Sequence, residues 1–255
     1  MYFNDLKGKT AMITGCGQGI GEGIAKGFLE NGANLILCAR NEISWLDKLQ
    51  TKNEINTIIS DIRNSSLLNE LIKELEKKGK QIDILVNNAG ILIEKELLDI
   101  TEDDWDTLID VNVKSLFFLS KEIVRHMIKN NNGGVIVNAA SFGASIPSYM
   151  AGIYACSKSA ALTLTKCMAA EWARYGIRVN AFSPGVFPTK MTRNAIEKNR
   201  ERMLEDIALH RFGDISEVVD CVLFLSSDLS RYLTGINLDV SGGKLIIQNP
   251  GVAWK

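Results

Sequence analysis

The stretch that decides the fold is Thr14-Gly15-Cys16-Gly17-Gln18-Gly19-Ile20-Gly21, in which three glycines follow the spacing G-x-x-x-G-x-G. It stands between a β-branched run, Thr10–Thr14, and a segment of helical periodicity over residues 19–31. Glycines permit a tight turn and let backbone N–H groups approach a phosphate at the positive end of a helix. We therefore predict a strand–loop–helix unit whose loop binds the pyrophosphate of a dinucleotide.

The loop residues expected to contact the pyrophosphate are Gly15, Gln18, Gly19, Ile20 and Gly21. Gly23 and Gly27 continue the four-residue spacing, so one face of the helix carries no side chains. This face is predicted to let the helix lie close to the sheet. The alternative is a glycine-rich turn that binds nothing, but the strand–loop–helix context favours binding.

Short β-branched runs alternate with longer segments of helical periodicity along the chain. The expected strands cover residues 10–14, 35–39, 55–60, 82–87, 134–139, 177–182 and 236–240. The expected helices cover residues 19–31, 65–78, 102–129, 151–175, 189–209 and 215–226. This alternation is typical of a parallel sheet with right-handed crossovers and helices on both faces. We predict a single α/β domain over residues 1–255, a Rossmann-type doubly wound parallel sheet of about seven strands.

The composition excludes several classes of protein. The chain has 29 basic and 30 acidic residues and a net charge of −1, which argues against binding nucleic acid or an anionic membrane. No stretch reaches the roughly 18 apolar residues of a membrane-spanning helix, and the first residues lack the pattern of a signal peptide. Two histidines and five cysteines without a C-x-x-C pair argue against a metal site. We expect a cytoplasmic enzyme with no metal and with buried, reduced thiols.

The end of the second expected strand indicates which dinucleotide is bound. A carboxylate there would bind the ribose diol of NAD(H), but the sequence has Ala39-Arg40-Asn41. The guanidinium of Arg40 can pair with a 2′-phosphate, which favours NADP(H) as the cofactor over NAD(H). Asp61 and Ile62 follow the third strand and are expected to contact the adenine. For Asp61, the alternative is a carboxylate at a helix N-terminus.

The segment Tyr154-Ala155-Cys156-Ser157-Lys158 carries a candidate acid/base pair. Side chains four residues apart share one face of a helix, so the phenol of Tyr154 and the ammonium of Lys158 point the same way. The pKa of a free tyrosine is about 10, and a nearby cation lowers it toward neutrality. Beside a nicotinamide cofactor, such a pair can exchange a proton with a carbonyl oxygen.

Together these motifs resemble the short-chain dehydrogenase/reductase family along nearly the whole chain. Besides the glycine loop, Asp61, Tyr154 and Lys158, the matching residues are Asn87-Asn88-Ala89-Gly90, Asn112, Ser141 and Pro184-Gly185. The stretches Arg211-Phe212-Gly213 and Tyr232-Leu233-Thr234-Gly235 are similar to members of the 3-oxoacyl-carrier-protein reductase type. The resemblance implies an oxidoreductase that transfers a hydride between nicotinamide and a carbonyl or secondary alcohol.

The resemblance also implies a role for each matching residue. Tyr154 would give a proton to the carbonyl oxygen, or take one in the reverse reaction, while Ser141 would hydrogen-bond that oxygen. Lys158 would lower the pKa of Tyr154 and hold the nicotinamide ribose, and Asn112 would position a water linking Lys158 to solvent. The other cofactor contacts would come from Asn88, Ala89, Gly90, Pro184, Gly185, Val186 and Thr189.

Simpler interpretations stay open for several residues and for the whole chain. Asn112 can be a polar helix residue, Ser141 a turn residue, and Thr189 the N-cap of the next helix. The protein can be a non-catalytic NADP(H)-binding regulator or scaffold. Among enzymes, the alternative is an NAD-dependent sugar-alcohol or hydroxysteroid dehydrogenase. The intact set of Asn112, Ser141, Tyr154 and Lys158 favours catalysis.

A helical segment at about residues 187–212 is expected to cover a small-molecule carbonyl or alcohol substrate. Its basic and acidic residues nearly cancel, so they give no preference for the sign of the substrate charge. The resemblance implies a homotetramer. The tail over residues 245–254 is apolar for a terminus, and we predict that it packs against a neighbouring subunit.

Overall fold

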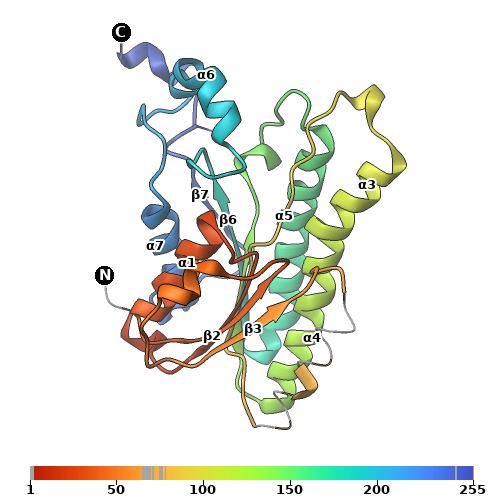
Figure 1. Cartoon of the computed structure of the whole chain (residues 1–255), viewed down its shortest axis with the longest axis vertical. Coiled ribbons are helices and arrows are strands. Elements are labelled where there is room, and N and C mark those ends of the chain that lie inside the picture. Colours follow the sequence, from red (N-terminus) through yellow and green to blue (C-terminus); the bar gives the residue numbers. More distant parts are fainter. Residues whose placement is uncertain are drawn as a thin grey trace.

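Seven strands form one parallel sheet in the part of the chain that the computed structural model describes, residues 3–64, 70, 72–74, 77, 79–244 and 246–254. They are β1 Thr10–Thr14, β2 Asn34–Ala39, β3 Ile55–Ile59, β4 Ile84–Asn87, β5 Gly134–Ala139, β6 Ile177–Pro184 and β7 Asn237–Val240. Their order across the sheet is β3-β2-β1-β4-β5-β6-β7. Figure 1 labels β2, β3, β6 and β7 of this sheet. The predicted doubly wound Rossmann-type fold is confirmed.

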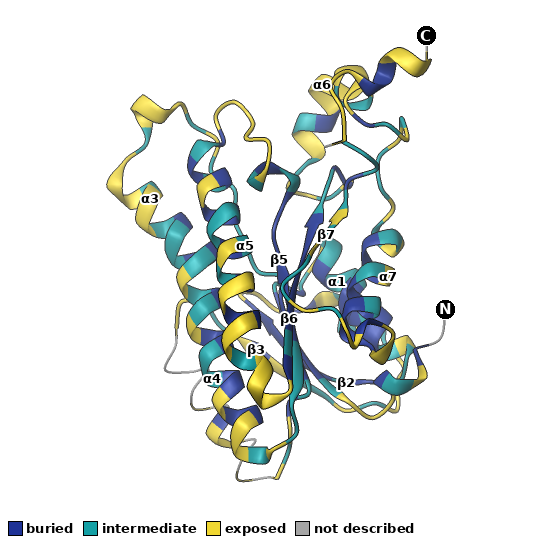
Figure 2. Ribbon diagram, turned by 180° about the vertical axis from the view of Figure 1, so that it is seen from behind, coloured by how far each residue is buried: buried dark blue, intermediate teal, exposed yellow. Residues whose placement is uncertain are grey.

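Helices cover both faces of this sheet (Figure 2). On one face lie α1 (Gly19–Glu30) and α7 (Ile215–Ser226), which contact each other. On the other face lie α4 (Ser115–Asn130) and α5 (Gly152–Trp172). Two further α-helices of the described residues are α3 (Glu102–Ile109), which precedes α4, and α6 (Arg193–Glu205), which lies beside the C-terminal tail.

The central strands β1 and β2 show why the sheet needs two layers of helices. Successive side chains of a strand point to opposite faces of the sheet. Ile13 and Leu35 belong to the apolar cluster beneath α1 and α7, while Met12 and Ile36 belong to the cluster beneath α4 and α5. All four are completely buried. Apolar residues on both faces are typical of a parallel sheet that is covered on both sides.

The glycine face of α1 packs differently from the prediction. A Cβ atom on Gly23 would come within 2.4 Å of Ile215 Cγ2, and one on Gly27 within 2.4 Å of Val219 Cγ1. Both contacts are with α7, so the prediction that this face lies against the sheet is wrong. The glycines instead let two neighbouring helices of the same layer approach each other closely.

Three predicted helices differ in detail from the structure. The long helix predicted over residues 102–129 is interrupted, because a π-helical turn, Asp110–Lys114, joins α3 to α4. The helix predicted over residues 189–209 is the shorter α6, and its backbone is non-helical at Asn199. The helix predicted over residues 65–78 lies for the most part outside the described residues.

The cysteines only partly follow the prediction of buried thiols. Cys16 and Cys38 are buried, but Cys156 and Cys167 are exposed on α5, so the prediction is wrong for these two. Across the described ranges, no helix is long and apolar enough to cross a membrane. Nor do the described residues bring three histidine, cysteine or acidic side chains together as a metal site would need.

Candidate active site

A cleft of about 640 Å³ opens at the carboxyl ends of the parallel strands, beside the neighbouring strands β1 and β4. The chain continues from β1 to β2 and β3 on one side, and from β4 to β7 on the other. Doubly wound sheets bind ligands at such a switch point. The volume lies within the range of about 300–1,000 Å³ that is usual for small-molecule sites.

The glycine loop forms one wall of the cleft, and it has no room for a side chain at Gly15 or Gly21. Gly15 has φ +68°, and a Cβ atom on it would lie 2.8 Å from Ala89 Cα. A Cβ atom on Gly21 would lie 2.2 Å from Gly15 O. In the part of the chain that is described, the N-cap residue Gln18 makes no capping bond with its side chain, which leaves the first N–H groups of α1 for another partner. This arrangement fits a dinucleotide pyrophosphate.

Most of the predicted site residues meet in this cleft. Its lining includes Gly15, Gln18, Gly19, Ile20, Gly21, Arg40, Asp61, Ile62, Asn88, Ala89, Gly90, Tyr154, Lys158, Pro184 and Thr189. The lining also contains residues that the motifs did not single out: Gly17, Cys38, Ala39, Asn41, Glu42, Ser44, Ser60, Ile91, Val111, Ala139, Ala140, Phe182, Lys190 and Met191. Many of these stand at the carboxyl end of a strand, a position that could have identified them.

Four predicted residues lie outside the described lining: Asn112, Ser141, Gly185 and Val186. Gly185 packs against the end of β7, where a Cβ atom would meet Ser241 Cα at 2.6 Å. Val186 is buried in a small apolar cluster with residues of the segment between β6 and α7. Thr189, in contrast, lines the cleft and is not the N-cap of α6, because that position belongs to Thr192.

Charged side chains surround the end of the cleft beside β2 and β3. Arg40 is exposed there. The carboxylate of Asp61 accepts from Arg63 Nε at 3.1 Å and from Arg63 Nη2 at 2.9 Å. This pairing lowers the pKa of Asp61, and Arg40 contributes in the same direction. Glu42 also lines the cleft, so a carboxylate that the motif at the strand end did not reveal stands two residues beyond Arg40.

At the opposite end, Tyr154, Ser141 and Lys158 converge from α5 and the end of β5. A Cβ atom on Gly143 would lie 3.4 Å from Ser141 Oγ and 3.7 Å from Tyr154 Cε1, so the two side chains flank the same point. Ser141 Oγ accepts from Gly143 N at 3.1 Å, which orients the hydroxyl. Lys158 Nζ lies 5.8 Å from the ring centre of Tyr154 and donates to Ala139 O at 2.8 Å.

Burial controls the ionisation of this group. Loss of water around the phenol raises the pKa of Tyr154, and its hydrogen bond with Ser141 lowers it by less. Burial lowers the pKa of Lys158 to about 8. The predicted lowering of the Tyr154 pKa by Lys158 is not found, since the amino group donates to Ala139 O instead. At neutral pH Tyr154 is therefore a phenol and can act as a proton donor.

Asn112 lies in the π-helical turn and is almost completely buried. Its Oδ1 accepts from Ile91 N, and its Nδ2 donates to Ile91 O and to Ser157 Oγ. The side-chain amide is thus a bridge between the loop after β4 and α5. A residue with three such bonds is more than a polar helix residue, and the water that the resemblance implied for it stays a prediction.

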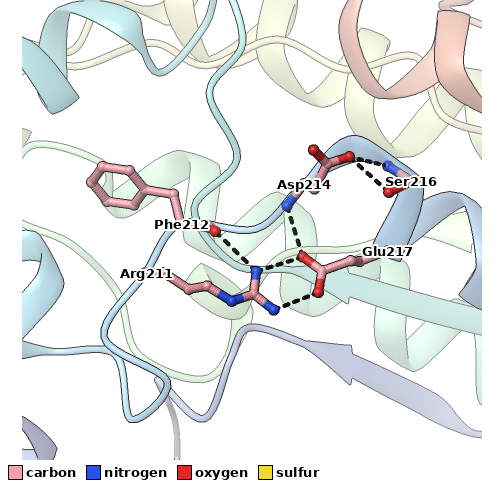
Figure 3. Close-up of polar contacts among 5 residues, drawn as sticks. All are labelled: Arg211, Phe212, Asp214, Ser216 and Glu217. Carbon is pink, nitrogen blue, oxygen red and sulfur yellow. Dashed lines mark hydrogen bonds and ion pairs between the residues drawn. The ribbon is translucent and has the colours of Figure 1, made fainter.

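The segment between β6 and α7 is tied to the fold at its far end (Figure 3). Arg211 Nη1 and Nη2 donate to the two carboxylate oxygens of Glu217 at 2.8 and 2.6 Å. Glu217 also closes the capping box of α7, because it accepts from Asp214 N at 2.8 Å. These bonds lower the pKa of Glu217 to about 2. The segment that carries α6 is therefore anchored to the start of α7.

Known proteins share both this sequence pattern and this fold. A family model described as enoyl-(acyl carrier protein) reductase matches residues 15–244. The 2-dehydro-3-deoxy-D-gluconate 5-dehydrogenase of Escherichia coli is 34% identical over 254 residues, 94% of this chain and 96% of that protein. The 3-oxoacyl-[acyl-carrier-protein] reductase FabG of Thermotoga maritima is 38% identical over 248 residues, 94% of this chain and 99% of that protein. The crystal structure of a gluconate 5-dehydrogenase from Burkholderia cenocepacia, in complex with NADP and tartrate, has a TM-score of 0.87 and 33% identity, covering 95% of this chain and 97% of that one.

A glycine loop at the switch point of a doubly wound sheet, with a partly buried tyrosine and a buried lysine beside it, defines a class of dinucleotide-binding oxidoreductases. The chain belongs to the short-chain dehydrogenase/reductase family, as its motifs predicted. It is an oxidoreductase of that family. The site can therefore be interpreted as an oxidoreductase active site.

Proposed function

We propose that the protein is an NADP(H)-dependent oxidoreductase that interconverts a carbonyl and a secondary alcohol, with Tyr154 as general acid/base. The observation that carries the proposal is the group of buried Ser141 and Lys158 with partly buried Tyr154 beside the glycine-loop cleft. Desolvated titratable groups in a cleft are typical of catalytic sites. A regulator that only binds the dinucleotide has no use for them.

The bound cofactor supplies the hydride, and the chain supplies the proton and the stabilisation of charge. Tyr154 donates its proton to the carbonyl oxygen in reduction and accepts one in alcohol oxidation. The Ser141 hydroxyl, oriented by Gly143 N, hydrogen-bonds the same oxygen. Lys158 would hold the nicotinamide ribose, with its amino group kept near the Tyr154 ring by its bond to Ala139 O.

The preference for NADP(H) is assigned to Arg40, which pairs with the 2′-phosphate. Its exposed position at the β2 end of the cleft supports this assignment. The related gluconate 5-dehydrogenase was crystallised with NADP, which is consistent with it. NAD(H) is the alternative cofactor, and Glu42 in the same lining is the feature that favours it. Initial rates with NADPH and NADH at equal concentration distinguish the two.

The names of the relatives suggest two groups of substrates, polyhydroxy acids of the gluconate type and 3-oxoacyl thioesters. Both carry the carbonyl or secondary alcohol that the site is suited to convert. A panel of keto acids, 3-oxoacyl thioesters, sugars and hydroxysteroids, followed by NADPH oxidation or NADP reduction, tests the proposal. Turnover of at least one compound is expected. Binding of NADPH without turnover of any compound would favour the non-catalytic regulator.

We also propose a cytoplasmic homotetramer, as the family resemblance implies. The tail contacts its own chain, since Trp254 Nε1 donates to Ala208 O at 3.0 Å and the rings of His210 and Trp254 stack at 5.3 Å. Ile246 and Val252 nevertheless stay 65% and 66% exposed, which suits contact with a neighbouring subunit. Deletion from Gln248 onward is expected to reduce the assembly size on a sizing column; an unchanged tetramer would reject the role of the tail.

A further inference from the structure

Ser157 lies between the two members of the acid/base pair and takes no part in the steps described above. Its side chain is completely buried on α5. Its Oγ donates to Tyr154 O at 2.7 Å and accepts from Asn112 Nδ2 at 3.0 Å. The hydroxyl thus links the helical turn that carries Tyr154 to the π-helical turn that carries Asn112.

The Asn112 amide extends this link to the loop after β4. Its Oδ1 accepts from Ile91 N at 2.9 Å, and its Nδ2 donates to Ile91 O at 2.9 Å. Because a side-chain amide has two N–H donors, Ile91 and Ser157 together use both. Asn112 is only 1% exposed, so loss of the Ser157 hydroxyl would leave a buried N–H without an acceptor, which is costly enough to reorient the amide.

The Asn112 amide also lies close to the amino group of Lys158, on the other side of Gly90. A Cβ atom on Gly90 would lie 3.3 Å from both Asn112 Oδ1 and Lys158 Nζ. A shift of the Asn112 amide therefore changes the packing of the backbone around Lys158. The ionisation of Lys158 depends on this packing, since burial lowers its pKa to about 8.

We propose that Ser157 is a positioning residue for proton transfer: by orienting the Asn112 amide, it holds the backbone of residues 90–91 against the amino group of Lys158. The proposal rests on the proposed function, because its effect is exerted on the Tyr154–Lys158 pair. The competing interpretation is that Ser157 is a small polar residue that only packs α5 against the π-helical turn.

Helix α5 offers a matched control about two turns further along. Thr165 Oγ1 accepts from Asn138 Nδ2 at 2.9 Å and donates to Ala161 O at 2.8 Å. These are the same two kinds of partner that Ser157 has, and Thr165 is equally buried at 1% exposure. Neither Thr165 nor Asn138 is among the described lining residues of the cleft. Thr165→Val therefore removes an equivalent pair of bonds and leaves the link from Asn112 to Ile91 intact.

The test compares Ser157→Ala with Thr165→Val in the full-length protein, using NADPH and the best carbonyl substrate of the panel. Both variants are expected to lose similar thermal stability. Only Ser157→Ala should lower kcat, by about tenfold, because misplacement of an acid/base group forfeits part of its contribution. Its kcat profile should also lose activity at a higher pH than the wild type, because water reaching Lys158 raises the pKa of that lysine toward its ordinary value.

A second variant, Ser157→Cys, keeps the side-chain size and a weak donor and acceptor, and it serves if Ser157→Ala does not fold. Its kcat should lie between those of the wild type and Ser157→Ala. The proposal would be overturned if a Ser157 variant kept the wild-type pH profile of kcat and lost no more activity than Thr165→Val.

Hydrogen exchange at the Ile91 amide separates this proposal from the proposed function. Exchange should be faster in Ser157→Ala and unchanged in Thr165→Val, because only the first variant frees the Asn112 amide that holds Ile91. If the wild type converts no compound of the panel, the proposed function fails, and faster Ile91 exchange still supports the positioning contact. Unchanged Ile91 exchange in Ser157→Ala would reject that contact whether or not the enzyme turns over.

Discussion

The two ends of the cleft treat charge in opposite ways. At the β2 and β3 end, Arg40 is exposed, and Asp61 is held as a carboxylate by Arg63. At the other end, Lys158 is buried and Tyr154 is partly buried, and this burial raises the pKa of Tyr154 and lowers that of Lys158, so it favours the neutral form of each. Solvated charges suit the recognition of a charged ligand, whereas desolvated groups suit the exchange of a proton near neutral pH. This contrast fits the proposal that one end selects the cofactor and the other end carries the chemistry.

The largest effect is expected for Tyr154→Phe, which removes the proton donor and keeps the ring. We expect kcat to fall by at least about 1,000-fold, within the range for loss of a general acid. NADPH affinity should change little, as measured by titration calorimetry. Tyr149→Phe is the matched control, because Tyr149 is exposed and bonds to Glu96 outside the described cleft lining. Substantial turnover by Tyr154→Phe would contradict the proposal that the Tyr154 end of the cleft carries the chemistry.

Lys158→Met is expected to lower kcat by about 100-fold and to change how stability depends on pH. The pKa of Lys158 is about 8 in the folded chain and 10.5 for the ordinary side chain. Below pH 8 the buried ammonium destabilises the fold, and this cost disappears as the pH rises from 8 to 10.5. Over that interval the wild type should become more stable relative to Lys158→Met by up to about 3 kcal/mol.

Denaturant unfolding of the wild type and Lys158→Met at several pH values measures this difference. If the free energies of unfolding of the wild type and Lys158→Met change with pH in parallel, Lys158 has an ordinary pKa. The catalytic end would then lack the desolvation that separates it from the β2 and β3 end.

Arg40→Ala is expected to act on binding alone. KM for NADPH should rise about tenfold, since one charge-assisted pair with the 2′-phosphate is lost, while KM for NADH should stay within about twofold. The NADPH effect should weaken at high salt, because Arg40 is exposed. Steady-state kinetics with both cofactors provides the measurement, and equal changes for NADPH and NADH would remove the specificity role from this end.

The smallest effect is expected for Glu217→Gln. Glu217 lies at neither end of the cleft, and the substitution weakens its bonds to Arg211, which are drawn in Figure 3. Arg211 and Glu217 are 53% and 42% exposed, so solvent screens the pair and stability should fall by less than about 1 kcal/mol. We expect a rise of about threefold or less in substrate KM with kcat unchanged, since side-chain bonds of this kind are weak. A large loss of kcat would mean that the anchor positions the catalytic end.

The comparison also separates what the sequence could predict from what it could not. The glycine loop, the sheet and the Tyr154–Lys158 pair follow from local rules: glycine spacing, strand–helix alternation and the four-residue repeat of a helix. The confirmed doubly wound parallel sheet and the meeting of these residues in one cleft show that the rules extend to the assembled fold.

The errors arise where tertiary packing decides. The contact of Gly23 with α7 depends on which helix lies alongside α1, and helical spacing does not specify that. The π-helical turn at Asn112 adds a residue to a helix that looks uninterrupted in sequence. The direction of the Tyr154 pKa shift depends on burial and on the orientation of Lys158, both of which need coordinates. Pattern alone predicted residues that meet in or beside one cleft, but it gave the opposite direction for the shift of the Tyr154 pKa.

The division between the two ends is tested most directly by measuring NADPH affinity and kcat side by side in Tyr154→Phe and Arg40→Ala. The two variants are predicted to show opposite effects. Tyr154→Phe keeps the wild-type dissociation constant for NADPH and loses turnover, whereas Arg40→Ala keeps kcat at saturating NADPH and loses affinity. Turnover retained in Tyr154→Phe, or kcat lost in Arg40→Ala with an unchanged dissociation constant, would contradict the account.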